Sequence, residues 1–216
     1  MITPAQSSNT ILKSVETNIT STRVIPVLVI ENAEYAADLA KVLVDSGLPI
    51  LEVTLRTPAA LNAMEAMAKV EGAIVAAGTV LNEQHVHECK SAGAEFLVSP
   101  GSTNNLIHSS AEADMPLLPG AATASEMMNL AEQGFHFLKF FPADINGGVA
   151  ALKSFASPLS QLTFCPTGGV NTENLKDYLS LNNVSCAGGS WLVTKDDLKN
   201  KDWKGIAKKA KQLHLS

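Results

Sequence analysis

Lys139 lies in the most apolar strand-like run of the chain, residues 137–142, which reads FLKFFP. Successive side chains of a strand alternate between two faces, so Phe137, Lys139 and Phe141 share one face and the residues between them share the other. Both faces are otherwise apolar, which is typical of a strand buried on both sides. Burial favours the neutral amine over the ammonium ion, because the charged form loses its hydration. A neutral amine is the species that forms an imine with a ketone, so Lys139 is a candidate nucleophile.

Glu52 lies on a second strand-like segment, residues 50–55, followed by Arg56. Alternation places Glu52, Thr54 and Arg56 on one face and leaves the other face apolar. We expect the apolar face to pack on helices, so the polar face points to the interior, where Glu52 can meet Lys139. The alternative interpretation is a buried ion pair with a purely structural role, since structural ion pairs also shift pKa values.

Arg56 is one of only two arginines in the chain, the other being Arg23. It falls at the carboxyl end of its strand, where a guanidinium can bind a carboxylate through two parallel hydrogen bonds. Thr79, which follows the strand expected at 74–77, is a second candidate donor to the same carboxylate. The alternatives are a surface ion pair for Arg56 and an ordinary turn residue for Thr79.

Two glycine pairs follow the last two expected strands, in the runs CPTGGV (165–170) and CAGGSW (186–191). Loops at these places, leading into helix N-termini, form a recurrent phosphate site in barrels. Glycines let backbone N–H groups approach an anion closely. One pair alone usually marks a tight turn, but two at neighbouring strand ends, one of them followed by Ser190, indicate an anion site.

Strand-like and helix-like segments alternate along the chain. The expected strands are 23–30, 50–55, 74–77, 95–99, 116–119, the strand that holds Lys139, 162–166 and 184–187. The expected helices are 7–19, 33–46, one from Thr57-Pro58, 82–92, 104–111, 124–133, a short one after 147–148, 172–181 and 203–213. Such alternation predicts a parallel sheet in an α/β protein.

Eight strand–helix units within 216 residues favour a closed (β/α)8 (TIM) barrel, at the small end of its usual size. We expect one domain over residues 1–216, with residues 1–22 as an N-terminal helical extension. In a barrel the second and sixth strands contribute to the same interior layers, and function lies at the carboxyl ends of the strands. The competing open, doubly wound sheet calls for a glycine-rich turn after the first strand. Residues 30–33 (IENA) contain no glycine.

The composition excludes several classes of partner. A net charge of -5 argues against nucleic acid, whose phosphates attract basic faces. The three cysteines (Cys89, Cys165 and Cys186) cannot all pair and match no zinc pattern, so we expect free thiols in a cytosolic protein. The five histidines show no metal-ligand spacing, so no metal is expected. Without a signal-peptide run or a membrane-spanning stretch, the expected location is cytoplasmic.

Six segments resemble, in the same order, those of the bacterial 2-keto-3-deoxy-6-phosphogluconate (KDPG) aldolases, also called 2-keto-4-hydroxyglutarate (KHG) aldolases. They are LEVTLRT (51–57), AGTVL (77–81), SPG (99–101), KFFPA (139–143), FCPTGG (164–169) and GGSWL (188–192). The resemblance covers Arg23 to Thr194. It implies a class I aldolase on a (β/α)8 barrel, a homotrimer of the Entner–Doudoroff pathway that uses a lysine imine and no other cofactor.

The resemblance also implies roles for individual residues. Lys139 would form the Schiff base and Glu52 would be the general acid/base. The pyruvate carboxylate and its pocket would be held by Arg56, Thr79, Pro100 and Phe141. The phosphate would be received by Gly168, Gly169, Gly189 and Ser190. Thr167 would lie near the aldehyde end and bear on stereochemistry.

The expected reaction is cleavage of KDPG to pyruvate and glyceraldehyde 3-phosphate. A second expected activity is cleavage of 4-hydroxy-2-oxoglutarate to pyruvate and glyoxylate, and the galactonate epimer of KDPG remains an alternative substrate. Two other classes of function also stay open at this point. One is a phosphate-binding isomerase on the same barrel, with Lys139 as an electrostatic group only, and the other is a non-catalytic phosphosugar-binding protein.

Overall fold

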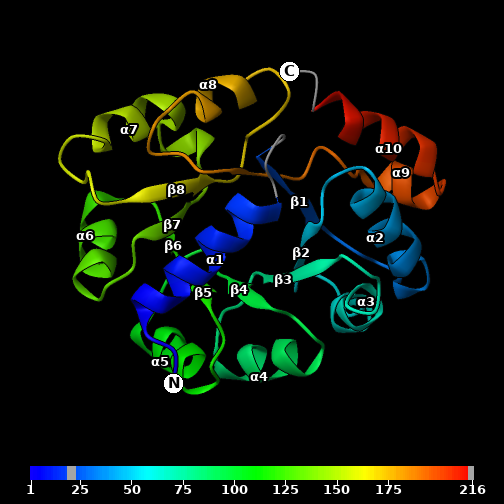
Figure 1. Ribbon diagram of the computed structural model, residues 1–216, viewed down its shortest axis with the longest axis horizontal. Coiled ribbons are helices and arrows are strands. Elements are labelled where there is room, and N and C mark those ends of the chain that lie inside the picture. The colour runs from blue at the N-terminus through cyan, green and yellow to red at the C-terminus, as the bar shows by residue number, and fades with distance from the viewer. Residues whose placement is uncertain (19–22, 214–216) are drawn as a thin grey trace.

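Strands and helices alternate through the computed structural model, which describes residues 1–18 and 23–213 (Figure 1). The strands are β1 (Val24–Leu28), β2 (Ile50–Thr54), β3 (Ile74–Gly78), β4 (Phe96–Val98), β5 (Leu117–Leu118), β6 (Gly120–Ala121), β7 (Phe137–Phe140), β8 (Thr163–Pro166) and β9 (Ala187–Gly189). The helices are α1 (Pro4–Asn18), α2 (Ala36–Asp45), α3 (Ala60–Met67), α4 (Glu83–Ser91), α5 (Asn104–Glu112), α6 (Ala124–Glu132), α7 (Gly148–Phe155), α8 (Leu175–Leu179), α9 (Lys195–Lys199) and α10 (Trp203–Gln212), with short 3-10 turns η1 (Ala33–Tyr35) and η2 (Asp144–Asn146).

The sheet is parallel and curled, with helices on its outer side (Figure 1). Six strands pair in the order β5-β4-β3-β2-β1-β9, and three in the order β6-β7-β8. Only Pro119 separates β5 from β6, and its lack of an N–H interrupts the ladder there. Isolated parallel bridges, Phe164 to Val184 and Thr167 to Gly188, pair β8 with the chain that runs into β9.

Two predictions about elements were wrong, and one helix was missed. The last strand begins at Ala187 rather than at 184, because the carbonyls of Val184 and Ser185 accept hydrogen bonds from the Arg23 guanidinium. Helix α3 begins at Ala60 rather than near Thr57, whose hydroxyl instead donates to the Ile30 carbonyl. Helix α9 was not predicted at all, although a capping box between Thr194 and Asp197 marks its start.

The predicted alternation on β2 and β7 is confirmed by two separate apolar layers. Phe137 and Ile50 lie in an inner layer, whereas Leu138, Phe140, Leu51 and Val53 belong to the outer layer that packs on helices. The full inner layer is Ile11, Val15, Ile25, Ile50, Ala76, Phe96, Val98, Leu118, Phe137, Cys165 and Cys186. The inner positions nearer the carboxyl ends of β2 and β7 are therefore left to polar side chains.

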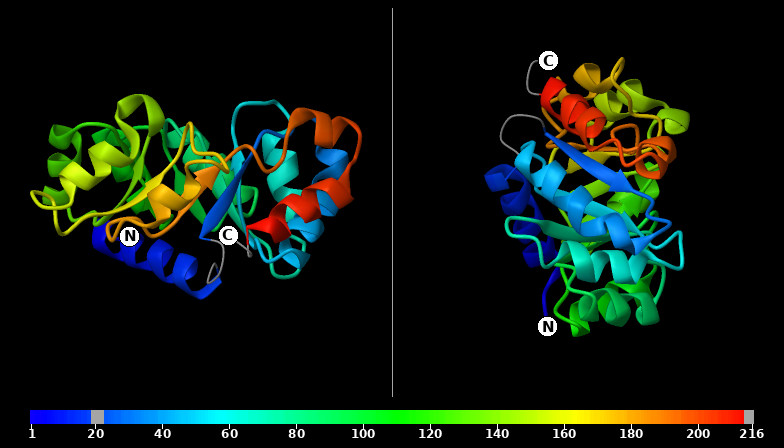
Figure 2. Two further views of the ribbon diagram at one scale, coloured as in Figure 1. Left: turned by 90° about the horizontal axis from the view of Figure 1, so that it is seen from above. Right: turned by 90° about the vertical axis from the view of Figure 1, so that its right-hand side faces the viewer.

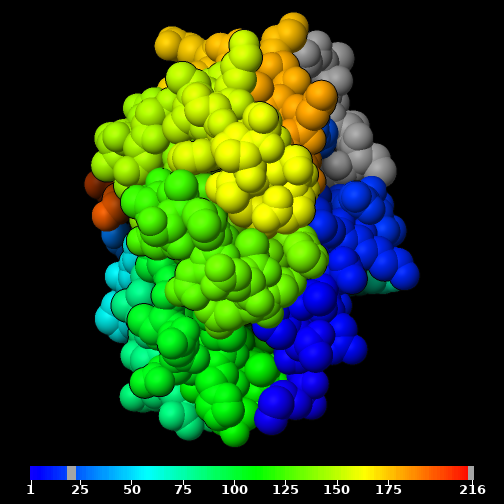
Figure 3. All heavy atoms as spheres, turned by 90° about the vertical axis from the view of Figure 1, so that its left-hand side faces the viewer, coloured from blue at the N-terminus to red at the C-terminus, as the bar shows by residue number. Residues whose placement is uncertain are grey.

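Helix α1 lies across the opening of the curled sheet at the amino ends of the strands (Figures 1 and 2). Its Ile11 and Val15 enter the inner layer, and its Ser8 hydroxyl accepts hydrogen bonds from the N–H groups of His136 and Phe137. The residues before it run beside the segment that holds α5, seen as blue against green in Figure 3, and the Ile2 N–H donates to the Ala111 carbonyl. The predicted helix 7–19 is thus present as Pro4–Asn18, with residue 19 outside the described residues.

Among the described residues, no helix combines the length and apolar character that crossing a membrane requires.

Candidate active site

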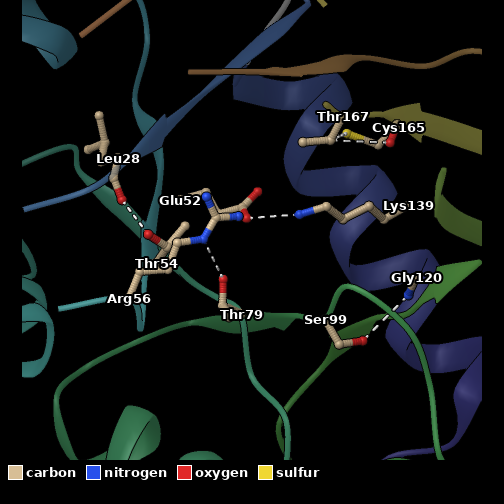
Figure 4. A network of polar contacts seen from close by, with 10 residues as sticks. All are labelled: Leu28, Glu52, Thr54, Arg56, Thr79, Ser99, Gly120, Lys139, Cys165 and Thr167. Carbon is tan, nitrogen blue, oxygen red and sulfur yellow. Dashed lines mark hydrogen bonds and ion pairs between the residues drawn. The ribbon is translucent and has the colours of Figure 1, made fainter. Parts of the chain in front are cut away.

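Lys139 and Glu52 meet in the interior of the curled sheet. Lys139 Nζ donates a hydrogen bond to Glu52 Oε1 at 3.0 Å, and the two residues are only 3% and 4% exposed (Figure 4). Lys139 comes from β7 of the three-stranded sheet and Glu52 from β2 of the six-stranded sheet, so the contact joins the two sheets. The distance lies in the ordinary range of hydrogen bonds, so a proton can pass directly between the two groups.

Small neighbours leave space for these long side chains. Lys139 pairs in register with Gly120 of β6, and Glu52 pairs with Ala76 of β3. Lys139 Nζ also lies 5.2 Å from the centroid of the Phe141 ring, which places that ring as a wall of the site. The expectation that Phe141 shares a face with Lys139 is confirmed.

Arg56 lies just beyond β2 with an exposed side chain. Its Nε donates to Thr79 Oγ1 at 3.3 Å, and among the residues that the structure describes no carboxylate is within ion-pair distance of it. The surface ion pair considered for Arg56 is therefore not formed there. Thr79 has φ +62°, in the left-handed region that a β-branched residue rarely occupies. Strain of this kind clusters at functional sites.

The two glycine-rich loops lie next to each other, because Thr167 and Gly188 form a parallel bridge. Gly168 and Gly169 have φ +92° and +83°, conformations that other residues rarely adopt. Ser190 is exposed beyond β9, and Gly189 is buried at its end. The first loop is fastened from η2, where the Asp144 N–H donates to the Gly168 carbonyl at 3.0 Å.

Pro100 follows β4 and is half-buried. It approaches Gly120 so closely that a Cβ at position 120 would overlap the Pro100 backbone. The Ser99 hydroxyl accepts a hydrogen bond from the Gly120 N–H at 3.4 Å, which ties this loop to the strand beside Lys139. Glu52 and Lys139 thus lie within β2 and β7, whereas Arg56, Thr79, Pro100 and Ser190 follow the carboxyl ends of their strands.

Three further glycines adjoin the site residues: Gly78, Gly120 and Gly188. Gly188 belongs to the second glycine pair noted in the sequence, whereas Gly78 and Gly120 were not predicted to bear on the site. Each would carry a Cβ into a neighbouring residue of the site. The signal available in the sequence was glycine at a strand end, which often marks a close approach of another group.

The three cysteines are free, as predicted, and all three are buried. Cys165 and Cys186 lie in the inner layer, and the pKa of Cys186 is raised well above its ordinary value by a hydrogen bond with Cys165 and by burial. Within residues 1–18 and 23–213, no group of three histidine, cysteine or acidic side chains is placed to hold a metal ion.

Comparison with known proteins identifies the family. The family described as "KDPG and KHG aldolase" matches residues 15–209. The KHG/KDPG aldolase of Escherichia coli K12 is 48% identical over 200 residues, which are 92% of this chain and 94% of that protein. The KDPG aldolase of Legionella pneumophila, solved with pyruvate captured as a covalent carbinolamine intermediate, has a TM-score of 0.87 at 40% identity and covers 92% of this chain and 97% of its own.

A KDPG aldolase from Zymomonas mobilis ZM4, solved with 3-phosphoglycerate, has a TM-score of 0.86 at 41% identity, with coverage of 94% of this chain and 96% of that one. Sequence and fold therefore agree over almost the whole chain. The protein belongs to the KDPG and KHG aldolase family.

Proposed function

We propose that this protein is a class I aldolase, a carbon–carbon lyase that cleaves KDPG to pyruvate and glyceraldehyde 3-phosphate. The observation that carries the proposal is the buried contact of Lys139 Nζ with Glu52 Oε1 at 3.0 Å. A buried lysine whose proton can move to an adjacent carboxylate becomes the neutral nucleophile that imine formation needs. The carbinolamine of pyruvate in the Legionella relative supports the same chemistry.

The catalytic cycle assigns one proton path to Glu52. The Lys139 amine adds to the C2 ketone, and loss of water gives an iminium ion. That cation accepts the electron pair released when the C3–C4 bond breaks, while Glu52 takes the proton of the C4 hydroxyl, directly or through a water. Glyceraldehyde 3-phosphate leaves, Glu52 protonates the enamine at C3, and water hydrolyses the imine to pyruvate. The covalent imine is the electron sink, so the proposed cycle includes no metal.

The remaining site residues would hold the two ends of the substrate. Arg56 and Thr79 would bind the pyruvate carboxylate, since the guanidinium keeps donors to spare beyond its bond to Thr79. Pro100 and Phe141 would line the pocket. The aldehyde and phosphate end would fall to Thr167, Gly168, Gly169, Gly189 and Ser190. The 3-phosphoglycerate in the Zymomonas relative supports a phosphate subsite in this fold.

We propose cleavage of 4-hydroxy-2-oxoglutarate to pyruvate and glyoxylate as a second activity, which the combined name of the Escherichia coli relative supports. The galactonate epimer of KDPG is the alternative substrate. Specificity constants (kcat/KM) for the three compounds decide among them, and a phosphate subsite predicts that KDPG has the highest.

The architecture and assembly belong to the proposal as well. We infer one domain over residues 1–216, a closed (β/α)8 barrel in which Pro119 interrupts one strand and the β8–β9 bridges complete the ring, with residues 1–22 as an N-terminal helical extension. A homotrimer and a place in the Entner–Doudoroff pathway follow the family. The free, buried thiols are typical of a cytoplasmic protein. Light scattering tests the trimer, which predicts a mass three times that of the chain.

Borohydride reduction in the presence of pyruvate tests the imine. Intact mass should rise by one pyruvate less one oxygen atom, and peptide mapping should locate the adduct at Lys139. Lys139→Met should abolish the adduct, whereas Lys153→Met, an exposed lysine on α7, should leave it. The isomerase and the non-catalytic binding protein both predict no adduct in the unaltered protein, so its absence would overturn the aldolase.

A further inference from the structure

The Glu52 side chain lies across Gly78 of the neighbouring strand. An ideal Cβ built on Gly78 would be 2.5 Å from Glu52 Oε1, 2.8 Å from Glu52 Cγ and 3.0 Å from Thr54 Cγ2. Unbonded carbon atoms keep about 3.5–4.0 Å apart. The overlap includes Cγ as well as the carboxylate, so rotating the end of the side chain would not relieve it. The observed position of the carboxylate therefore depends on the absence of a side chain at residue 78.

That position is the one from which Glu52 reaches Lys139. Gly78 pairs in register with Thr54, and the residue paired with Glu52 itself is Ala76. The part of β3 beside the carboxylate therefore contains the two smallest residue types, glycine and alanine. Gly78 is not among the glycines with left-handed φ, so alanine can adopt its backbone conformation. The Gly78→Ala substitution therefore tests only the space that the added methyl group occupies, without backbone strain.

Gly188 leaves space for the Thr167 side chain in the same way that Gly78 leaves space for Glu52. A Cβ on Gly188 would overlap the Thr167 hydroxyl and lie 3.0 Å from Thr167 Cγ2. Gly188 also has no left-handed φ. The Thr167 side chain therefore lies over β9 in space that only glycine leaves open.

We propose that Gly78 and Gly188 are positioning residues, each acting through the side chain that its missing Cβ admits. Gly78 sets the Glu52 carboxylate for proton transfer with the pyruvate end, and Gly188 sets Thr167 at the aldehyde end. The inference rests on the proposed aldolase function and assigns the two glycines to different halves of the same reaction.

Two assays separate the halves. Exchange of the pyruvate methyl protons with D2O, followed by NMR, needs the Lys139 imine and proton transfer by Glu52 but no aldehyde. Cleavage of KDPG and of its galactonate epimer needs both ends of the site. Borohydride trapping of pyruvate reports whether Lys139 is still in a folded site.

Gly78→Ala should slow methyl exchange by about 10²-fold, the scale expected when a catalytic group is displaced by roughly 1 Å. Borohydride should still trap pyruvate at Lys139 in this variant. Gly188→Ala should leave exchange within about 2-fold, yet change the ratio of kcat/KM for the two epimers by about 10-fold, within the range that pocket contacts give. Gly101→Ala is the matched control, since nothing lies within 4 Å of a Cβ at that exposed glycine, and both assays should stay within about 2-fold of the unaltered protein.

The overlap of a Cβ at residue 78 with Glu52 should also affect thermal stability. If Gly78→Ala lowers the melting temperature, the same change in a Glu52→Ala background should lower it by less than half as much, because the overlapped atoms are gone. Unchanged methyl exchange in Gly78→Ala, or an equal loss of melting temperature in both backgrounds, overturns the role of Gly78. Unchanged epimer selectivity in Gly188→Ala overturns that of Gly188. Failure of the aldolase proposal is distinguishable, since the unaltered protein would then give no pyruvate adduct.

Discussion

The two ends of the strands differ in how completely their polar groups are satisfied. At the amino ends the inner layer is apolar, α1 covers it, and the polar groups there are paired, as where Ser8 accepts from two N–H groups of β7 and its preceding residue. Nearer the carboxyl ends, Glu52 bonds to Lys139 and Arg56 bonds to Thr79, and Glu52, Arg56 and Thr79 keep further hydrogen-bonding capacity. Unused hydrogen-bonding capacity gathered at one end of the strands indicates where a ligand can bind.

The two arginines show how hydrogen bonding differs between the two ends of the strands. Arg23, near the amino end of β1, donates to the carbonyls of Leu179 and Ser185 at 2.8 Å each and also to that of Val184. Arg56 makes one bond, at 3.3 Å, to Thr79. The same guanidinium therefore fastens a loop at one end and stays available for a carboxylate at the other.

The largest expected effect is on turnover, from a change at the carboxyl end. Glu52→Gln should lower kcat for KDPG by ~10²–10⁴-fold, because the amide cannot take the C4 hydroxyl proton. Pyruvate should still be trapped on Lys139 by borohydride. Steady-state kinetics measures the loss, with Glu65→Gln, an exposed glutamate of α3, as the control that should not change. Equal turnover in Glu52→Gln would remove its assignment as the base.

The matching change at the amino end should affect stability instead. Ile11 is 1% exposed within the inner layer, so Ile11→Ala should lower the free energy of unfolding by about 2–5 kcal/mol through lost burial and a cavity. The kcat of the folded protein should stay within about 2-fold, since the site lies at the opposite strand ends. Urea unfolding and kinetics are the measurements, and exposed Lys13→Ala is the control. A large loss of kcat with no loss of stability would contradict the division between the ends.

Much of the site followed from the sequence because period-two alternation is a local property. It predicted that Lys139 and Glu52 point inward and meet, and that Leu138 and Phe140 face the helices. It did not predict Gly78, because the lean of Glu52 over the next strand depends on the register between β2 and β3. Pairing register is a long-range property that a single strand's pattern does not contain.

The bounds of the last strand were predicted wrongly for a related reason. Residues 184–187 have the composition of a strand, but the Arg23 guanidinium, far away in sequence, takes two of their carbonyls. The ladder is therefore displaced toward Gly188 and Gly189, whose missing side chains also suit the site. Composition predicted a strand over residues 184–187, whereas tertiary contacts place the strand at Ala187–Gly189.

The arginine pair offers a smaller, reciprocal test. Arg23→Met should lower the free energy of unfolding by about 1–3 kcal/mol, because carbonyls lose charged donors, and should leave KM unchanged. Arg56→Met should raise KM for KDPG by about 10–100-fold, the loss of one charged hydrogen-bonding partner, and should change stability by less than about 0.5 kcal/mol. Unfolding curves and initial rates on both variants give the result. If both arginines affected the same quantity, the contrast between the two ends would fail.

The smallest effect concerns Cys89, a titratable group of the outer layer that has no part in the proposed site. Burial, and then the charge of Glu88, raises the pKa of the Cys89 thiol to about 12. The unfolded chain loses this proton near its ordinary value of ~8.5, while the folded chain keeps it. Unfolded molecules therefore bind fewer protons above that pH, and the free energy of unfolding should fall as pH rises, by ~1.4 kcal/mol per pH unit for this one group.

Cys89→Ala removes that term, so its deficit in stability relative to the unaltered protein should shrink as pH rises from about 8 to about 10, measured by urea unfolding at each pH. Val86→Ala is the matched control, because Val86 is equally buried on α4 and does not titrate, so its deficit should stay constant. A deficit for Cys89→Ala that also stays constant would mean that the thiol ionises alike in both states. Turnover should be unchanged in both variants, because Cys89 and Val86 both belong to the outer layer and neither is part of the proposed site.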